Sequence, residues 1–213
     1  MKPIESFIDQ VIHGDCVTVM KSMPTESVDI IITDPPYLVG YVPRDGRRCL
    51  GDDAHDWLLP AFREMYRVLK RDRFCISFYG WPRCDWFMEA WQRNGFRPVS
   101  HLVWVKEHRS RTGYTQSCHE VGFLLAKGKP PRPANPPRDV LPWEYTGNDL
   151  HPNQKPVVAI TPLIEAYSGP GDIVFDPFAG SGTTGVAAQS RDRLFILIEK
   201  HFGHVQTARK RLL

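Results

Sequence analysis

The chain has 213 residues, of which 42% are hydrophobic and 24% are charged, a balance typical of a globular protein and not of a disordered one. Its length predicts a single domain, 1–213. The formal net charge of +3 is too small to establish nucleic-acid binding, although it is compatible with it.

No run approaches the roughly 20 apolar residues that cross a bilayer, so we expect no membrane partner. The N-terminal stretch MKPIESFIDQ carries acids and no long apolar core, unlike a signal peptide. The five cysteines are odd in number and form no C-x-x-C pair, which indicates neither a disulfide framework nor a zinc site. We therefore expect no metal and a reducing, cytoplasmic setting.

Short apolar runs alternate with helical patterns along the chain, which predicts an α/β domain with a mostly parallel sheet. Seven strands are predicted, at 10–14, 28–33, 74–80, 98–105, 120–126, 172–176 and 194–199. Helices are predicted at 57–70, 84–95, 160–167 and 202–212.

The strands at 98–105 and 120–126 are too close in sequence for a crossover helix, so they are predicted to form an antiparallel pair. Their connection, 106–119, is mostly basic in charge. The segment 127–142, KGKPPRPANPPRDVLP, is rich in proline. Because proline lacks a backbone N–H, this segment is predicted to be an extended surface loop and neither a helix nor a central strand.

The stretch VDIIITDPPY places an acid, two prolines and a tyrosine directly after a buried-looking strand. One interpretation is a strand followed by a turn. The other is a reaction centre built around Asp34 at the carboxyl end of that strand, where open α/β sheets bind ligands.

A second stretch, DIVFDPFAGSGTTGVAAQ, runs from a strand into Asp176, a glycine-spaced turn and a helix-compatible segment. Glycines there let the backbone approach a ligand, and a helix N-terminus offers free N–H groups. The triphosphate-binding loop is excluded because its lysine is absent. The letters Gly180-x-Gly182-x-x-Gly185 do fit a dinucleotide site, so that alternative stays open.

Three acids are predicted to lie at strand ends: Asp34, Asp176 and Glu199. Glu199 follows Gly180 by 19 residues and closes the strand LFILIE, a position suited to binding ribose hydroxyls. A dinucleotide would need the same acid, so Glu199 alone does not discriminate between ligands.

These motifs together resemble the S-adenosylmethionine-dependent DNA amino-methyltransferases. Residues 34–37 match the family's D-P-P-Y, and 178–183 match its F-x-G-x-G-T. D-P-P-Y comes first, which is the order of the family's β group. Gly14-Asp15-Cys16 and 151–156 (HPNQKP) resemble two further motifs of the group, and the ending EKHFGHVQTARKRL resembles its last helix.

The resemblance implies a Rossmann-like methyltransferase fold, with a seven-stranded mostly parallel sheet, an antiparallel strand pair and a circularly permuted motif order. It implies methyl transfer from S-adenosylmethionine to the N6 amine of adenine in a short sequence of double-stranded DNA. The base would be flipped out of the duplex. D-P-P-Y leans to adenine in this group and S-P-P-Y to cytosine, so methylation of cytosine N4 is the alternative.

The resemblance also implies a role for each motif residue. The Asp34 carboxylate and the Pro35 carbonyl would accept hydrogen bonds from the base amine, so that its lone pair can attack. Pro35 and Pro36 fix φ and remove competing donors, and Tyr37 would stack on the base.

By the same resemblance, Gly180, Gly182 and Thr183 hold the amino-acid end of the cofactor and Glu199 takes its ribose hydroxyls. The other residues implied at the cofactor site are Asp15 and Cys16 beside the adenine ring, Lys155 near the methionine carboxylate, and Asp176 and Phe178 in the glycine turn.

DNA contact is expected from two basic loops, 42–53 and 106–119. Their candidate phosphate-binding residues are Arg44, Arg47, Arg48, Lys106, Arg109 and Arg111. The target-reading region of the group would correspond to 106–150, which is short, so we expect a short recognition site, a homodimer, or both.

Two alternatives belong to other classes of protein. A nicotinamide dehydrogenase could use the glycine pattern, but the glycine turn lies within about the last 40 residues, leaving no room for the rest of a dinucleotide fold. A non-catalytic DNA-binding module would not need the intact D-P-P-Y centre. The resemblance implies a bacterial or phage-encoded enzyme of the cytoplasm.

Overall fold

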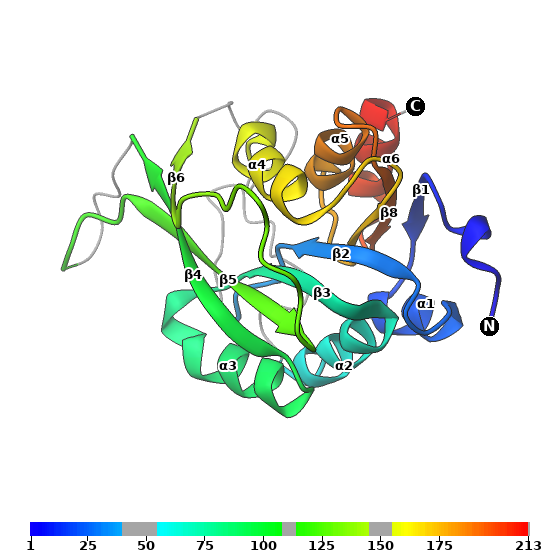
Figure 1. Ribbon diagram of the computed structural model, residues 1–213, viewed down its shortest axis with the longest axis horizontal. Helices are drawn as coiled ribbons and strands as arrows, with labels where there is room; N and C mark the ends of the chain where they lie inside the picture. The colour runs from blue at the N-terminus through cyan, green and yellow to red at the C-terminus, as the bar shows by residue number, and fades with distance from the viewer. Residues whose placement is uncertain (40–54, 108–113, 145–154, 213) are drawn as a thin grey trace.

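The computed structural model describes residues 1–39, 55–107, 114–144 and 155–212. These form one sheet of eight strands in the order β1-β8-β7-β2-β3-β5-β4-β6 (Figure 1). The strands are β1 (Gln10–His13), β2 (Val28–Thr33), β3 (Leu69–Phe78), β4 (Arg97–Lys106), β5 (His119–Lys127), β6 (Val140–Trp143), β7 (Ile173–Asp176) and β8 (Leu194–Glu199). The expected fold class is confirmed, but the expected seven strands are one too few.

Seven of the eight strands run in one direction. β1, β8, β7, β2 and β3 pair in parallel, β5 is antiparallel to both β3 and β4, and β4 pairs in parallel with β6. The predicted antiparallel pair is therefore confirmed, with β5 as the reversed strand. Its start lies at the same edge of the sheet as the carboxyl ends of the other seven.

Helices cover both faces of the sheet. In Figure 1, α1 (Cys16–Ser22), α2 (Leu58–Val68) and α3 (Cys84–Arg93) lie below the sheet. α4 (Val157–Tyr167), α5 (Thr183–Gln189) and α6 (Phe202–Leu212) lie above it. This three-layer arrangement is what a sheet of mostly parallel strands requires, since crossover connections place helices on its faces.

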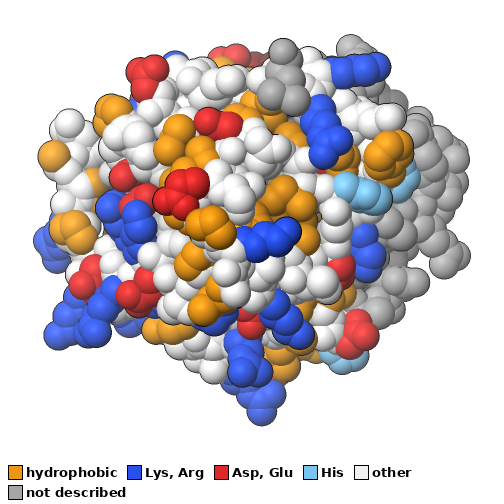
Figure 2. Space-filling model, turned by 90° about the vertical axis from the view of Figure 1, so that its right-hand side faces the viewer, with side chains coloured by type: hydrophobic (Ala, Val, Ile, Leu, Met, Phe, Trp, Pro, Cys, Tyr) orange, Lys and Arg blue, Asp and Glu red, His pale blue; other side chains and the backbone are white. Residues whose placement is uncertain are grey.

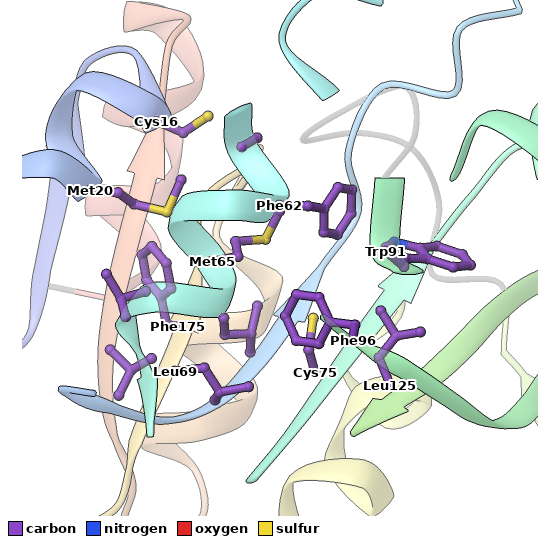
Figure 3. Packing of buried hydrophobic residues seen from close by; sticks show 14 of the residues in the cluster. Cys16, Met20, Phe62, Met65, Leu69, Cys75, Trp91, Phe96, Leu125 and Phe175 are labelled. Carbon is purple, nitrogen blue, oxygen red and sulfur yellow. The ribbon is translucent and has the colours of Figure 1, made fainter. Parts of the chain in front are cut away.

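Two apolar clusters fill the layers. On one face, Phe62 and Met65 of α2 and Trp91 of α3 pack with Met20 of α1 against the sheet (Figure 3). On the other face, the cluster includes Ile160 and Leu163 of α4, Ala187 of α5 and Val205 of α6. β2 lies between both clusters and is buried along its whole length, as its near-continuous apolar run predicts.

Two helices differ from the sequence-based expectations. The helix expected at 57–70 ends at Val68, and β3 begins at Leu69. Helix α1 was not predicted, although Asp15 caps it by accepting a hydrogen bond from the Thr18 amide.

The proline-rich segment 127–142 ends in the unpredicted strand β6. β6 is the edge strand of the sheet and pairs on one side only. Proline is tolerated there, because a missing N–H on the open side breaks no ladder bond. The expectation that this segment forms no central strand is confirmed.

The face that carries β1 and α1 shows acidic and basic side chains interspersed (Figure 2). Among the described residues, no helix is long and apolar enough to cross a membrane.

Candidate active site

The site lies at the edge where the strand ends gather. Chain order reverses between β2 and β7, which are neighbours in the sheet: the chain proceeds outward from β2 to β3 and from β7 to β8. Asp34 follows β2, and Asp176 ends β7. The two carboxylates thus lie on either side of the point where open α/β sheets form their ligand crevice.

Asp34 is the first carboxylate of the site. Its Oδ2 accepts a hydrogen bond from Lys155 Nζ at 2.5 Å, across 121 residues of sequence. Its Oδ1 is buried and has no hydrogen-bond partner in the described part of the chain. Burial raises the pKa of Asp34, although Lys155 opposes that shift.

Tyr37 lies between Asp34 and a second carboxylate, Glu120. The Tyr37 hydroxyl donates to Glu120 Oε2 at 3.3 Å, and Lys106 forms an ion pair with the other oxygen of Glu120. Burial disfavours the charged form of Glu120, but Lys155 and Lys106 outweigh it and its pKa is lowered. The antiparallel course of β5 is what brings Glu120 to this edge.

Gly80 lets the D-P-P-Y loop approach β3. A Cβ on Gly80 would lie 2.7 Å from the Cβ of Tyr37 and 2.9 Å from its carbonyl oxygen. Any larger residue would push Tyr37 out of place, since real Cβ atoms do not approach so closely. Gly80 ends the strand that was expected at 74–80, whereas β3 itself ends at Phe78; a glycine just after a strand was the available signal.

Asp176 organises the glycine turn that follows it. Its Oδ1 accepts from the Phe178 amide at 3.0 Å, and its Oδ2 accepts from the Thr184 hydroxyl at 2.7 Å. Burial raises the pKa of Asp176 to about 7. One carboxylate oxygen is thus engaged by the glycine turn and the other by the first turn of α5.

Glu199 is held by backbone amides. Its Oε2 accepts from Gly180 N at 2.9 Å and its Oε1 from His201 N at 2.6 Å, while His204 Nδ1 lies 3.8 Å from Oε1. Burial opposes ionisation, but these donors outweigh it and the pKa of Glu199 is lowered. A carboxylate oxygen can accept two hydrogen bonds, so capacity for ribose hydroxyls remains.

The glycine turn packs closely on the last helix and strand. Gly182 has a φ of +84°, and a Cβ there would lie 2.9 Å from Ala208 Cβ of α6. At Gly185 a Cβ would lie 2.8 Å from Leu197 of β8. Arg211 of α6 donates to the Ser181 carbonyl at 2.8 Å, which ties the turn to the C-terminal helix.

The remaining cofactor candidates surround this turn. Phe178 packs against Trp57, with ring centroids 5.1 Å apart. Asp15 caps α1 and lies 3.5 Å from Lys200, and Cys16 is buried behind it. Hydrogen bonds from Thr18 outweigh burial and lower the pKa of Asp15. The structure thus gives Asp15 a capping role at the start of α1.

Most of the expected DNA-binding residues lie outside the described residues: Arg44, Arg47, Arg48, Arg109 and Arg111. Lys106 is described; it pairs with Glu120, and its Nζ lies 5.2 Å from the ring centroid of Trp143. Of the range 106–150, β5 and β6 belong to the sheet.

Sequence reasoning missed Glu120, Gly80 and Trp143. Glu120 begins a strand that was expected to be antiparallel, and that expectation could have placed it beside Asp34. Trp143 could not be found, because its strand was not predicted. Among the described residues, no group of three or more His, Cys, Asp or Glu side chains could hold a metal ion.

A mostly parallel sheet, with acids at the strand ends on either side of its switch point and a glycine turn beside one of them, is the arrangement of an α/β protein that binds a nucleoside-containing ligand. The chain belongs to the DNA methylase family, whose N6_N4_Mtase model matches residues 28–210. The family depends on S-adenosylmethionine, which confirms the expected cofactor. The match favours a methyltransferase over the dehydrogenase alternative.

Individual relatives agree with this assignment. YubD of Escherichia coli (strain K12), whose name is "putative methylase", is 53% identical over 188 residues, covering 88% of this chain and 83% of YubD. The DNA adenine methyltransferase YhdJ of the same strain is 30% identical, covering 95% of this chain and 82% of YhdJ.

Solved structures match as well. The complex of M1.HpyAVI with S-adenosylmethionine superposes with a TM-score of 0.79 at 27% identity, covering 95% of this chain and 98% of that one. The cytosine-N4-specific PvuII DNA methyltransferase also gives 0.79, at 20% identity, covering 96% of this chain and 86% of that one. The latter likeness establishes the fold alone.

Proposed function

We propose that this chain transfers a methyl group from S-adenosylmethionine to the N6 amine of adenine in a short sequence of duplex DNA. The observation that carries the proposal is the Asp34 carboxylate, which follows β2 at the switch point. One of its oxygens is held by Lys155, and the other is buried without a partner in the described chain. A buried acceptor without a donor costs free energy, and the N–H of a base amine would satisfy it.

The described residues fit the cofactor. Glu199 is fixed and ionised at the end of β8 for the ribose hydroxyls, and Gly182 allows the turn to approach closely. S-adenosylmethionine, when bound, supplies an electrophilic methyl group. Asp34 and the Pro35 carbonyl orient the amine, and Tyr37 offers a flat face for the flipped base. The base must leave the duplex to reach this pocket, at a cost of a few kcal/mol.

Adenine is proposed over cytosine on two grounds. The reaction centre is D-P-P-Y, which leans to adenine in the group that it resembles. YhdJ, at 30% identity, is named as a DNA adenine methyltransferase. We also propose that 106–150 and 42–53 contact the DNA, because both carry basic residues.

The test uses purified protein, methyl-tritiated S-adenosylmethionine and duplex DNA. We expect the label to enter DNA, and chromatography of the hydrolysed nucleosides to show 6-methyladenine. Asp34→Ala removes both acceptor oxygens, and it should abolish labelling while leaving the affinity for S-adenosylhomocysteine within about twofold. Labelling that persists in Asp34→Ala would overturn the mechanism, and labelled 4-methylcytosine would overturn the choice of base.

A further inference from the structure

Lys155 contacts the proposed catalytic carboxylate directly. It lies just before α4, and its side chain is 10% exposed against 25% for Asp34. The 2.5 Å contact between Lys155 Nζ and Asp34 Oδ2 is a partly buried, charge-assisted hydrogen bond. A lysine is almost never buried unless it is paired, so this contact accounts for the position of the ammonium group.

Aromatic rings surround that ammonium group. Its Nζ lies 5.4 Å from the ring centroid of Tyr37, 5.1 Å from that of Phe78 and 5.8 Å from that of Trp143. These rings come from the loop after β2, the end of β3 and the end of β6. Cations are attracted to aromatic faces at about 6 Å or less, so the rings favour the charged form of Lys155 and restrict its place.

Lys155 lies between two acids. It contacts Asp34 directly and also interacts electrostatically with Glu120 from β5. Glu120 is itself paired with Lys106 and accepts a hydrogen bond from the Tyr37 hydroxyl. Asp176 from β7 adds a further acid beside Asp34. Without Lys155, Asp34 would be a partly buried carboxylate near two other acids, which favours its protonated form.

The contact also makes the two carboxylate oxygens of Asp34 different from each other. Oδ2 is occupied by Lys155, and only Oδ1 is left without a partner in the described chain. If the proposed function is correct, the base amine must meet Oδ1. We propose that Lys155 is a positioning residue for methyl transfer: it keeps Asp34 ionised and holds Oδ2, so that Oδ1 receives the amine.

This role differs from binding the methionine carboxylate of the cofactor, and the two roles can be separated. Lys155→Met removes the charge but keeps the length of the side chain, and Lys155→Arg keeps the charge. Lys21→Met, at an exposed lysine of α1, is the matched control. All are compared by kcat as a function of pH and by affinity for S-adenosylhomocysteine.

We expect Lys155→Met to lower kcat at pH 7 by tenfold or more. The reason is that, below the pKa of Asp34, each unit by which that pKa rises lowers the ionised fraction of Asp34 about tenfold. The deficit should shrink as pH rises and Asp34 ionises. Cofactor affinity should stay within about twofold, Lys155→Arg should keep the wild-type pH profile, and Lys21→Met should match wild type. Weaker cofactor binding with an unchanged profile would overturn the proposal, as would an equal loss at every pH.

A measurement that needs no activity completes the test. The carboxyl ¹³C resonance of Asp34, assigned with Asp34→Asn, is titrated in cofactor-free protein. We expect the pKa of Asp34 to be at least one unit higher in Lys155→Met than in wild type, and equal values would overturn the proposal. Failure of the proposed function would instead appear as wild-type protein that labels no adenine while this titration still distinguishes the variants.

Discussion

The site has two parts, one at the ends of β7 and β8 and the other at β2 and β5, and they hold their carboxylates in different ways. At the β7–β8 end, Asp176 and Glu199 accept hydrogen bonds mainly from backbone amides, those of Phe178, Gly180 and His201. At the β2–β5 end, Asp34 and Glu120 are held by side chains: Lys155 and Tyr37 come from 121 and 83 residues away, and Lys106 from 14.

This difference matches two tasks proposed for the site, cofactor binding at the β7–β8 end and methyl transfer at the β2–β5 end. Backbone amides cannot move without unfolding the turn, so the cofactor end is preorganised by local chain geometry. Lysine and tyrosine side chains depend on the packing of β2, β3, β5 and β6 together. The catalytic end therefore exists only in the completed sheet. Substitutions should affect cofactor binding and methyl transfer separately, according to the end at which they fall.

The largest expected effect concerns Asp176 and the pH dependence of stability. Its pKa is raised from 3.8 to about 7 in the folded protein, so folding favours its protonated form. That contribution is complete below the pKa of the unfolded chain and is lost as pH rises through about 7. The difference corresponds to on the order of 4 kcal/mol at high pH.

Urea unfolding of wild type and Asp176→Asn, between pH 4 and pH 8, measures this effect. The stability of wild type relative to Asp176→Asn should fall with rising pH and level off above about 7. Asp85→Asn, at an exposed acid of α3, is the control. A constant difference between wild type and Asp176→Asn over this range would contradict the prediction.

The second effect concerns cofactor affinity at Glu199. Loss of charged hydrogen bonds to the ribose should cost about 3 kcal/mol in Glu199→Ala, which is roughly a hundredfold in Kd for S-adenosylhomocysteine. Calorimetric titration gives this value directly. Glu199→Gln keeps one acceptor oxygen and should lose less. Unchanged affinity in Glu199→Ala would place the ribose elsewhere.

The third effect tests the catalytic end alone. Gly80→Ala introduces a Cβ 2.7 Å from that of Tyr37, and relieving the overlap should cost about 2 kcal/mol. DNA methylation should fall roughly 30-fold, with cofactor affinity unchanged. Gly169→Ala, where a Cβ would meet no atom closer than 3.9 Å, is the matched control. A loss of cofactor affinity in Gly80→Ala would show that the two ends are not separable.

The same contrast explains what sequence could predict. The D-P-P-Y and glycine-turn motifs each span a few residues, so their place at strand ends follows from local pattern. The choice of Glu199 as the candidate ribose-binding acid follows from its spacing to Gly180. In contrast, the contact of Lys155 with Asp34 depends on the neighbourhood of β2 and β7, which no local pattern encodes.

Two elements were missed for related reasons. β6 has four residues including Pro142, and its pairing with β4 is decided by the open sheet edge and not by its composition. α1 has seven residues, too few to show a helical period, and only the pairing of Asp15 with Thr18 marked its start.

The smallest effect measures how the distant contacts cooperate. Burial and the nearby acids raise the pKa of Tyr37 well above 10, so its hydroxyl is protonated and donates to Glu120. At 3.3 Å this bond is long, so its coupling energy should be about 1 kcal/mol. A cycle of Tyr37→Phe, Glu120→Ala and the double variant should show it as a roughly fivefold departure from additivity in kcat/KM for DNA. Strictly additive losses would mean that Tyr37 is placed by Gly80 and the prolines alone, and that Glu120 serves only Lys106 and Lys155.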